Sequence, residues 1–164
     1  MRGLNNHYIA GFVDGEGCFS LNYRADKRYD DSGNKIYEYH YWKTEFAIVL
    51  HPIDANLLRL IKDKLGVGNI SFKRAGDQVR YSVQNTTELN DVIVPFFKEN
   101  PLFGTKAKDF QLWGQAVELL NTHKQKKRTG QGRPLDESVE KKLRGIKVQM
   151  DSIKKKGRIQ GRDV

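Results

Sequence analysis

The chain has 164 residues, of which 38% are hydrophobic and 30% charged, and its formal net charge is +9. This length suits a single domain with a buried core, and the lone cysteine, Cys18, excludes an internal disulfide and a cysteine-based zinc site. The apolar runs are too short to cross a membrane, and the polar first residues are unlike a signal peptide. We therefore expect a soluble protein in a reducing compartment.

The positive charge gathers at the C-terminal end of the chain. Residues 1–121 hold 15 basic and 15 acidic side chains, whereas residues 122–164 hold 14 basic and 5 acidic ones. Such an excess favours a polyanionic partner through counterion release, and a solvated, solubilising tail explains it equally well. We divide the chain into a core over residues 1–121 and a basic loop and helix over residues 122–164. We expect this second part to pack on the same domain or to extend it.

The first half of the chain begins with a short helix and continues with alternating apolar and polar residues, which predict half-buried strands. Asn5 or Asn6 can cap the helix, and Gly15 and Gly17 are expected to break it. The predicted elements are a helix over 7–13, a strand over 18–24, a polar loop over 25–35 with a turn at 30–34, and a strand over 39–49.

The second half opens at Pro52, a residue suited to the first turn of a helix. An apolar stripe on this helix consists of Ile53, Leu57, Leu60, Ile61 and Leu65, and Gly66 ends it. The later predicted elements are a hairpin with strands over 69–74 and 79–84, and helices over 89–97, 105–120 and 135–155.

Two pairs of strands separated by helices predict an α+β fold, with an antiparallel sheet that has helices on one face. The strand residues expected to face the helices are Phe19, Leu21, Phe46, Ile48, Ile70, Phe72, Tyr81 and Val83. The opposite phase of the same strands is polar, so the second face of the sheet is expected to be free.

Residues 9–17 read Ile-Ala-Gly-Phe-Val-Asp-Gly-Glu-Gly, and this segment resembles the defining motif of the LAGLIDADG homing endonucleases. Further stretches similar to this family follow in matching order. They are Gly17-Cys18-Phe19, Leu50-His51-Pro52-Ile53-Asp54, Gly66-Val67-Gly68-Asn69-Ile70, Ile93-Val94-Pro95-Phe96-Phe97, Asn100-Pro101-Leu102, and Lys106 ahead of Asp109-Phe110. The resemblance covers about residues 6–121 and implies an αββαββα fold with a saddle-shaped, four-stranded antiparallel sheet. The motif occurs once, and single-motif members of the family act as homodimers.

The motif residues suit a paired helix. Gly11 and Gly15 share one side of the helix, where the missing Cβ atoms let a second backbone approach, and we add Ala10 to this interface. Two-fold symmetry would then bring the two Glu16 side chains together. Phosphodiester hydrolysis needs a cation, and Mg²⁺ prefers hard oxygen ligands. The resemblance implies the Glu16 carboxylate and the Gly15 carbonyl as ligands of Mg²⁺, with Mn²⁺ or Ca²⁺ as other occupants, and gives Asp14 a mainly structural role.

Lys106 resembles the basic residue that these enzymes hold near the metal-bound water molecules, where an ammonium could stabilise charge on the phosphate. The alternative is an exposed lysine at the start of a helix. Leu50 departs from the family pattern, because many members carry a water-holding glutamine there. If Leu50 faces the DNA as the resemblance implies, alternation turns His51 away, so a base role for His51 is only weakly supported.

The polar phase of the strands supplies the expected DNA-reading positions, since Arg or Lys recognises guanine and Gln or Asn recognises adenine in the major groove. These positions are Ser20, Asn22, Arg24, Tyr39, Tyr41, Lys43, Glu45, Ser71, Lys73, Gln78, Arg80, Ser82 and Gln84. Ordinary solvent exposure of a one-sided sheet is the alternative explanation. Glu45, Ala47 and Val49 attract phosphate little, so the centre of the site is expected to be read weakly or through DNA deformability.

The sequence thus predicts a site-specific double-strand DNA endonuclease, a homing endonuclease or meganuclease that hydrolyses phosphodiester bonds with a divalent metal. We expect a homodimer on a pseudo-palindromic target, with the basic tail on phosphates. One alternative is a non-cleaving DNA- or RNA-binding protein of the family, a maturase or a regulator, and another is one half of a two-motif monomer. By family resemblance the compartment is an organelle, mitochondrion or chloroplast, or a bacterial cytoplasm, and the gene is associated with an intron.

Overall fold

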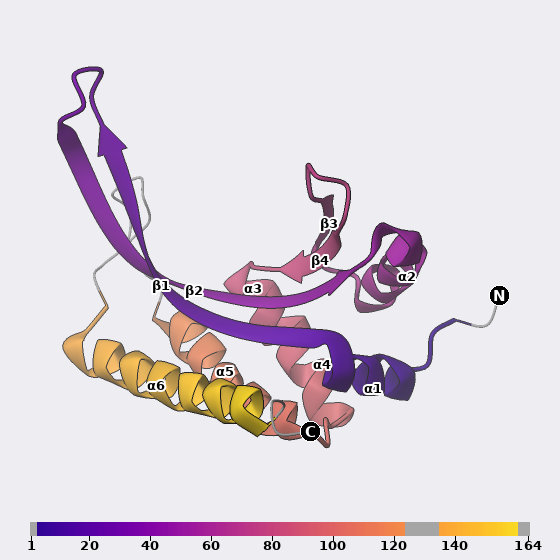
Figure 1. Cartoon of the computed structure of the whole chain (residues 1–164). Coiled ribbons are helices and arrows are strands. Elements are labelled where there is room, and N and C mark those ends of the chain that lie inside the picture. The colour runs from indigo at the N-terminus through magenta and orange to yellow at the C-terminus, as the bar shows by residue number, and fades with distance from the viewer. Residues whose placement is uncertain (1–2, 124–134, 161–164) are drawn as a thin grey trace.

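The computed structural model describes residues 3–123 and 135–160, and Figure 1 shows how they are arranged. Its elements are α1 (Asn6–Glu16), β1 (Gly17–Tyr29), β2 (Lys35–Leu50), the 3-10 turn η1 (Pro52–Asp54), α2 (Ala55–Leu65), β3 (Asn69–Phe72), β4 (Val79–Val83), α3 (Thr86–Glu88), the π-helical turn η2 (Leu89–Ile93), α4 (Val94–Glu99), α5 (Thr105–Thr122) and α6 (Glu137–Gln160). Within the described residues, no helix is both long and apolar enough for a membrane span.

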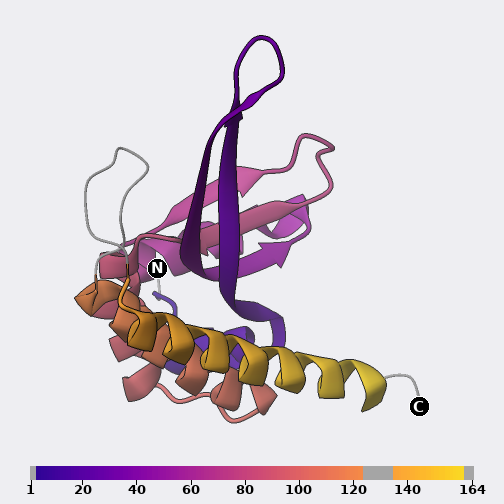
Figure 2. The same ribbon diagram turned by 90° about the vertical axis from the view of Figure 1, so that its left-hand side faces the viewer.

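The four strands form one antiparallel sheet in the order β1-β2-β4-β3. Helices α4, α5 and α6 lie beneath one face of it, and the two hairpins rise at either end, which gives the sheet its saddle shape (Figures 1 and 2). The predicted α+β fold with helices on one face is confirmed. The other face stays open, as the polar phase of the strands predicts.

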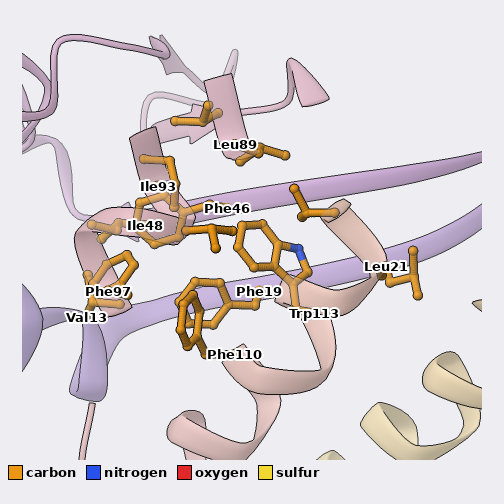
Figure 3. Close-up of a cluster of buried hydrophobic side chains, with 14 of the residues drawn as sticks. Val13, Phe19, Leu21, Phe46, Ile48, Leu89, Ile93, Phe97, Phe110 and Trp113 are labelled. Atoms are coloured by element: carbon orange, nitrogen blue, oxygen red, sulfur yellow. The ribbon is translucent and has the colours of Figure 1, made fainter. Parts of the chain in front are cut away.

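The core lies between the sheet and the helices and is built around Phe19, which has no exposed surface. Its ring centroid lies 4.9 to 5.7 Å from those of Phe46, Phe97, Phe110 and Trp113 (Figure 3). The indole nitrogen of Trp113 donates to the carbonyl oxygen of Ser20 at 3.2 Å, so this buried polar atom is satisfied. The packing fixes the first residues of β1, which directly follow the end of α1.

The β1–β2 hairpin is longer than the sequence predicts. The turn lies at residues 30–34 as expected, and the Asp30 carboxylate holds it by accepting from the backbone of Ser32 and Asn34 at 2.9 and 2.8 Å. The prediction of a loop over 25–35 is wrong, because Ala25 to Tyr29 pair with β2. These residues are too polar to show apolar alternation, yet cross-strand pairing satisfies their backbone groups.

Several predicted apolar faces also differ from the structure. Phe72 is 53% exposed at the end of the short edge strand β3, whereas Ile70 is half-buried and packs against the core as predicted. On α2 the buried residues are Ala55, Leu58, Ile61 and Leu65. Ile53 belongs to the preceding turn and is 81% exposed, while Leu60 is 41% exposed. The helix α1 continues through Gly15 and ends where Gly17 begins β1.

The C-terminal helix α6 belongs to the same folded unit, because its apolar stripe is buried against the rest of the chain. The buried residues are Val139, Leu143, Ile146 and Met150. It runs beside α5 on the helix side of the sheet (Figures 1 and 2). The described part of the basic tail therefore lies on the side away from the open face. The predicted basic loop, residues 124–133, lies outside the described residues.

Candidate active site and nucleic-acid interface

Hydrogen bonds in both directions join the end of α1 to the start of α5. The Asp14 carboxylate accepts from the backbone N–H groups of Phe103 and Gly104 at 2.7 and 3.1 Å. In return, the Lys106 ammonium donates to the carbonyl oxygens of Asp14 and Gly15 at 2.8 and 2.6 Å. The last carbonyls of a helix lack intrahelical partners and carry its negative dipole end, so a cation stabilises them. We name this arrangement of Asp14 and Lys106 the α1–α5 clasp.

Glu16 follows the clasp directly and is exposed. Among the described residues it has no hydrogen-bond or ion-pair partner, so its carboxylate is free to bind something else. The next residue, Gly17, fixes the backbone there, because a Cβ at Gly17 would lie 2.5 Å from the Val13 side chain and 2.8 Å from the Val13 carbonyl oxygen. The chain thus presents a free carboxylate on a rigid helix-to-strand junction.

Oxygen atoms around this junction suit a hard cation only in part. The described residues contain no group of three or more His, Cys, Asp or Glu that could hold a metal ion. They do offer the free Glu16 carboxylate and main-chain carbonyls, and the carbonyl of Gly15 already attracts the ammonium of Lys106. A full ligand shell for Mg²⁺ or Ca²⁺ would need further oxygens from water, from a phosphate or from a second unit.

The exposed side of α1 carries both predicted interface glycines. A Cβ at Gly11 or Gly15 would meet nothing within 4 Å, so neither position is crowded by the chain itself. Tyr8, 48% exposed, stacks on Phe12 beside them at a ring distance of 6.1 Å. Ala10 points the other way and is 5% exposed in the core of its own chain. Its predicted place in the interface is therefore wrong, because the helical turn between positions 10 and 11 separates the two faces.

The open face of the sheet brings the predicted DNA-reading residues together. Strand register sets Ser20 opposite Glu45, Asn22 opposite Lys43, Arg24 opposite Tyr41 and Ser71 opposite Arg80. Ser82 lies opposite Ala47 on the same face, while Lys73, Gln78 and Gln84 continue the phase just outside the strands. All of the predicted positions are exposed or half-buried. Their grouping on one surface agrees with a nucleic-acid interface.

Leu50 does not lie on this surface. It pairs with the fully buried Val79 and packs against the core, in the same phase as Ile48. The expectation that Leu50 faces the DNA is therefore wrong. His51 is exposed, but its Nδ1 accepts from the backbone N–H of Ile53 at 3.3 Å and so caps η1. This bond occupies the nitrogen that a base would use.

Two features of the open face were not predicted from the sequence. Tyr37 extends the row of Tyr39 and Tyr41, with stacked rings 6.3 and 5.6 Å apart. It was missed because residue 37 lies in the strand extension that lacks apolar alternation. Glu45 binds both Arg80 and Gln84, at 2.7 and 2.6 Å. Since these partners are 35 and 39 positions away, no local pattern could have signalled them.

Comparisons with known proteins agree with this geometry. A family model described as LAGLIDADG endonuclease matches residues 9–117. The chain is 36% identical over 121 residues to the probable intron-encoded endonuclease 3 of Neurospora crassa, covering 72% of this chain and 21% of that protein. It is 31% identical over 109 residues to the probable intron-encoded DNA endonuclease 1 of Mycosarcoma maydis, covering 66% of this chain and 35% of that protein.

Solved structures with the same fold include the I-LtrWI LAGLIDADG homing endonuclease bound to target DNA, with a TM-score of 0.73 and 25% identity. The match covers 92% of this chain and 45% of that one. Another is I-SmaMI bound to an uncleaved DNA target in the presence of calcium ions, with a TM-score of 0.73, 24% identity and coverage of 91% and 45%. The chain spans about a fifth to a third of these curated relatives and less than half of these structures. With the motif at the end of α1 and the family model spanning most of the chain, this protein belongs to the LAGLIDADG endonuclease family.

Proposed function

We propose that this chain is one unit of a nuclease that cuts both strands of DNA at a specific site, as a homing endonuclease does. The single observation that carries the proposal is the free, exposed carboxylate of Glu16, held on a rigid junction beside the ammonium of Lys106. A carboxylate that can bind a cation, with an ammonium on the carbonyl of the preceding residue, supplies two kinds of group that can assist phosphodiester hydrolysis. An intron-encoded origin, which the relatives' names carry, is part of the proposal.

A second unit is required to cut the second strand. The solved neighbours are each about twice as long as the matched region, so each has room for two such units. This chain has one motif and one exposed glycine stripe on α1. We infer that α1 packs against the same helix of a second copy, which makes the target pseudo-palindromic. The competing arrangement is a longer protein that holds both units, and sedimentation of the chain on a duplex distinguishes them.

Glu16 and the Gly15 carbonyl are the atoms we assign to a divalent cation, with Mg²⁺ as the proposed ion. When bound, such a cation neutralises phosphate charge and makes a water molecule more acidic. Lys106 supplies a second positive charge at the same place, and the α1–α5 clasp holds Glu16 in position. His51 and Leu50 have no assigned role, since one caps η1 and the other packs in the core.

DNA is proposed to lie along the open face of the sheet. Its side chains include Arg24 and Lys43, which can donate to base edges, and Gln84, which can both donate and accept. A two-stranded ribbon fits the major groove, and the phosphates supply affinity that falls with salt. A non-cleaving protein of this family would bind nucleic acid on the same face, but it would not hydrolyse a phosphodiester bond at Glu16.

The experiment is a cleavage selection on a library of duplexes with randomised sequence, run with Mg²⁺ and with a chelator. Nuclease function predicts double-strand breaks that depend on the metal and converge on one target sequence. Enrichment of a sequence that stays uncut at every Mg²⁺ concentration would support the non-cleaving maturase or regulator. Cleavage that persists in the chelator would remove the divalent metal from the proposal.

A further inference from the structure

Three side chains on the open face form one bonded cluster. The guanidinium of Arg80 donates from Nη2 to Oε2 of Glu45 at 2.7 Å, and the amide nitrogen of Gln84 donates to Oε1 of the same carboxylate at 2.6 Å. Both carboxylate oxygens are therefore occupied. The Glu45 side chain is only 13% exposed, against 40% for Arg80. A charge-assisted bond to a carboxylate shielded in this way is stronger than an ordinary surface ion pair.

The cluster lies over Ala47, whose small side chain leaves room for it on the open face of the sheet. Ala47 and Ser82 lie opposite each other, with Glu45 two positions before Ala47 on β2 and Arg80 two positions before Ser82 on β4. The strands are antiparallel, so Glu45 and Arg80 reach toward each other from opposite sides of this pair. Ala47 is accordingly only 2% exposed, although it lies in the phase of the open face.

A fixed arginine differs chemically from a free one. A guanidinium has five N–H donors in a rigid fork, so a bond from Nη2 leaves other donors available. Holding the side chain in place also lowers the rotamer entropy that is lost when it binds a ligand. A carboxylate by itself repels phosphate, so Glu45 would weaken DNA binding if it had no other effect. The two hydrogen bonds that Glu45 accepts provide such an effect, because they orient Arg80 and Gln84.

We propose, resting on the function proposed above, that Glu45 is a positioning residue which makes Arg80 the reader of a guanine in each half-site. The O6 and N7 atoms of guanine in the major groove accept two parallel hydrogen bonds from an arginine fork. Glu45 thereby sets sequence preference at a base pair that it does not itself contact. This differs from a direct role, in which the Glu45 carboxylate accepts from the amino group of cytosine.

The test is a binding selection from a randomised duplex library by the full chain, followed by sequencing, without any need for cleavage. The variants are Arg80→Gln, Glu45→Gln and, as a matched control, Lys43→Gln. Lys43 lies on the same strand and face and, within the described residues, has no ion-pair partner. Its substitution should weaken binding and change base preference only at its own position, and it should leave the guanine preference assigned to Arg80 in place.

We expect the unmodified chain to enrich guanine at one position of the half-site and Arg80→Gln to lose that enrichment. Glu45→Gln should reduce the preference at the same position by about tenfold or more, the discrimination expected of a bidentate pair, without loss of total affinity. Thermal unfolding of Glu45→Gln checks that the sheet is intact.

Two results would overturn this assignment while leaving the nuclease proposal standing. In one, Glu45→Gln keeps the guanine preference that Arg80→Gln loses. In the other, it alters a position that Arg80 does not control, as direct cytosine reading requires. If the unmodified chain enriches no sequence at all, the proposed function itself fails and this inference fails with it.

Discussion

Lys106 has two roles, because it holds the end of α1 and also lies beside the carbonyl oxygen that we assign to the metal. Its ammonium bonds to the Gly15 carbonyl at 2.6 Å, and that carbonyl is the atom we assign to the metal. Two cations beside one oxygen repel each other, so the lysine and the metal ion are electrostatically opposed while both attract the phosphate. Lys106 should therefore raise the rate of cleavage and weaken the binding of the metal.

The substitution Lys106→Met tests this opposition. We expect the rate at saturating Mg²⁺ to fall on the order of 100-fold, as when one charge-stabilising donor is lost. The Mg²⁺ concentration at half-maximal rate should also fall, because the competing ammonium is gone. Lys108→Met, an exposed position of the same helix, is the control and should change neither quantity. A higher Mg²⁺ requirement in Lys106→Met would contradict the electrostatic argument.

Asp109 is a second residue whose charge has a measurable consequence. Burial raises the pKa of its carboxyl, and the positive charges of Lys154 and Lys106 only partly offset this effect. Its Oδ1 is buried and has no hydrogen-bond partner among the described residues. Above the ordinary pKa of an aspartate, the folded chain still holds a proton that the unfolded chain has released. The stability that this proton supplies is lost as the pH rises through the raised pKa of the folded chain.

The substitution Asp109→Asn removes this proton linkage. The free energy of unfolding of the variant, relative to the unmodified chain, should increase as the pH rises above the ordinary range of a carboxyl group and then level off once the Asp109 carboxyl of the folded chain is ionised. Urea unfolding at a series of pH values measures it. A difference that decreases with rising pH would mean that the ion pair with Lys154, 3.7 Å away, outweighs the effect of burial.

Among the elements, α6 is held chiefly by apolar contacts. Leu143 is fully buried, whereas the polar links to β1 and β2 lie at the margin of the interface. Those links include the bond from Trp42 Nε1 to Glu140 at 3.0 Å and the guanidinium of Arg144 4.9 Å from the centre of the Tyr23 ring. Together they support the long β1–β2 hairpin from the side opposite its open face.

Leu143→Ala should therefore lower the free energy of unfolding by about 2–5 kcal/mol, the range for a buried leucine. Val148→Ala is the matched control on the same helix, since Val148 is 69% exposed, and it should change stability by less than about 0.5 kcal/mol. Chemical denaturation measures both. Equal effects of the two substitutions would mean that α6 is not packed as described.

The elements also show which features a sequence of this kind reveals. Periodicity predicted α1, α5, the β3–β4 hairpin and the turn at 30–34, because apolar spacing and turn residues act locally. Motif order led to Glu16 and Lys106. The strand extensions, the orientation of Ala10 and Leu50, and the cluster around Glu45 were missed. The strand extension and the Glu45 cluster depend on partners distant in sequence, which no local pattern encodes. Ala10 and Leu50 were misplaced for another reason, because the family resemblance was followed in place of the helical and strand periodicity that the structure obeys.

For the whole molecule, the decisive question is what covers the glycine stripe of α1. In a helix an alanine is favoured over glycine by about 0.5–1 kcal/mol, and the single chain has room for a Cβ at Gly11. In the proposed pair of helices the same Cβ would hold the two backbones apart. The effects on the single chain and on the pair should therefore have opposite signs.

Gly11→Ala is expected to stabilise the isolated chain and to weaken its self-association. Gly145→Ala in α6 is the control, because a Cβ there also meets nothing within 4 Å and the residue belongs to a different helix from α1. It should stabilise the chain without changing association. Sedimentation equilibrium on duplex DNA reports the assembly. Unchanged association in Gly11→Ala would place the interface elsewhere.

We propose that the phosphodiester bond is cut at the end of α1, and Glu16→Gln removes the charge on which that proposal rests. The substitution keeps the size and polarity of the side chain but removes its charge. On the selected duplex with Mg²⁺, we predict binding within about threefold of the unmodified chain and cleavage at least about 100-fold slower. Cleavage by Glu16→Gln at the unmodified rate would contradict the account.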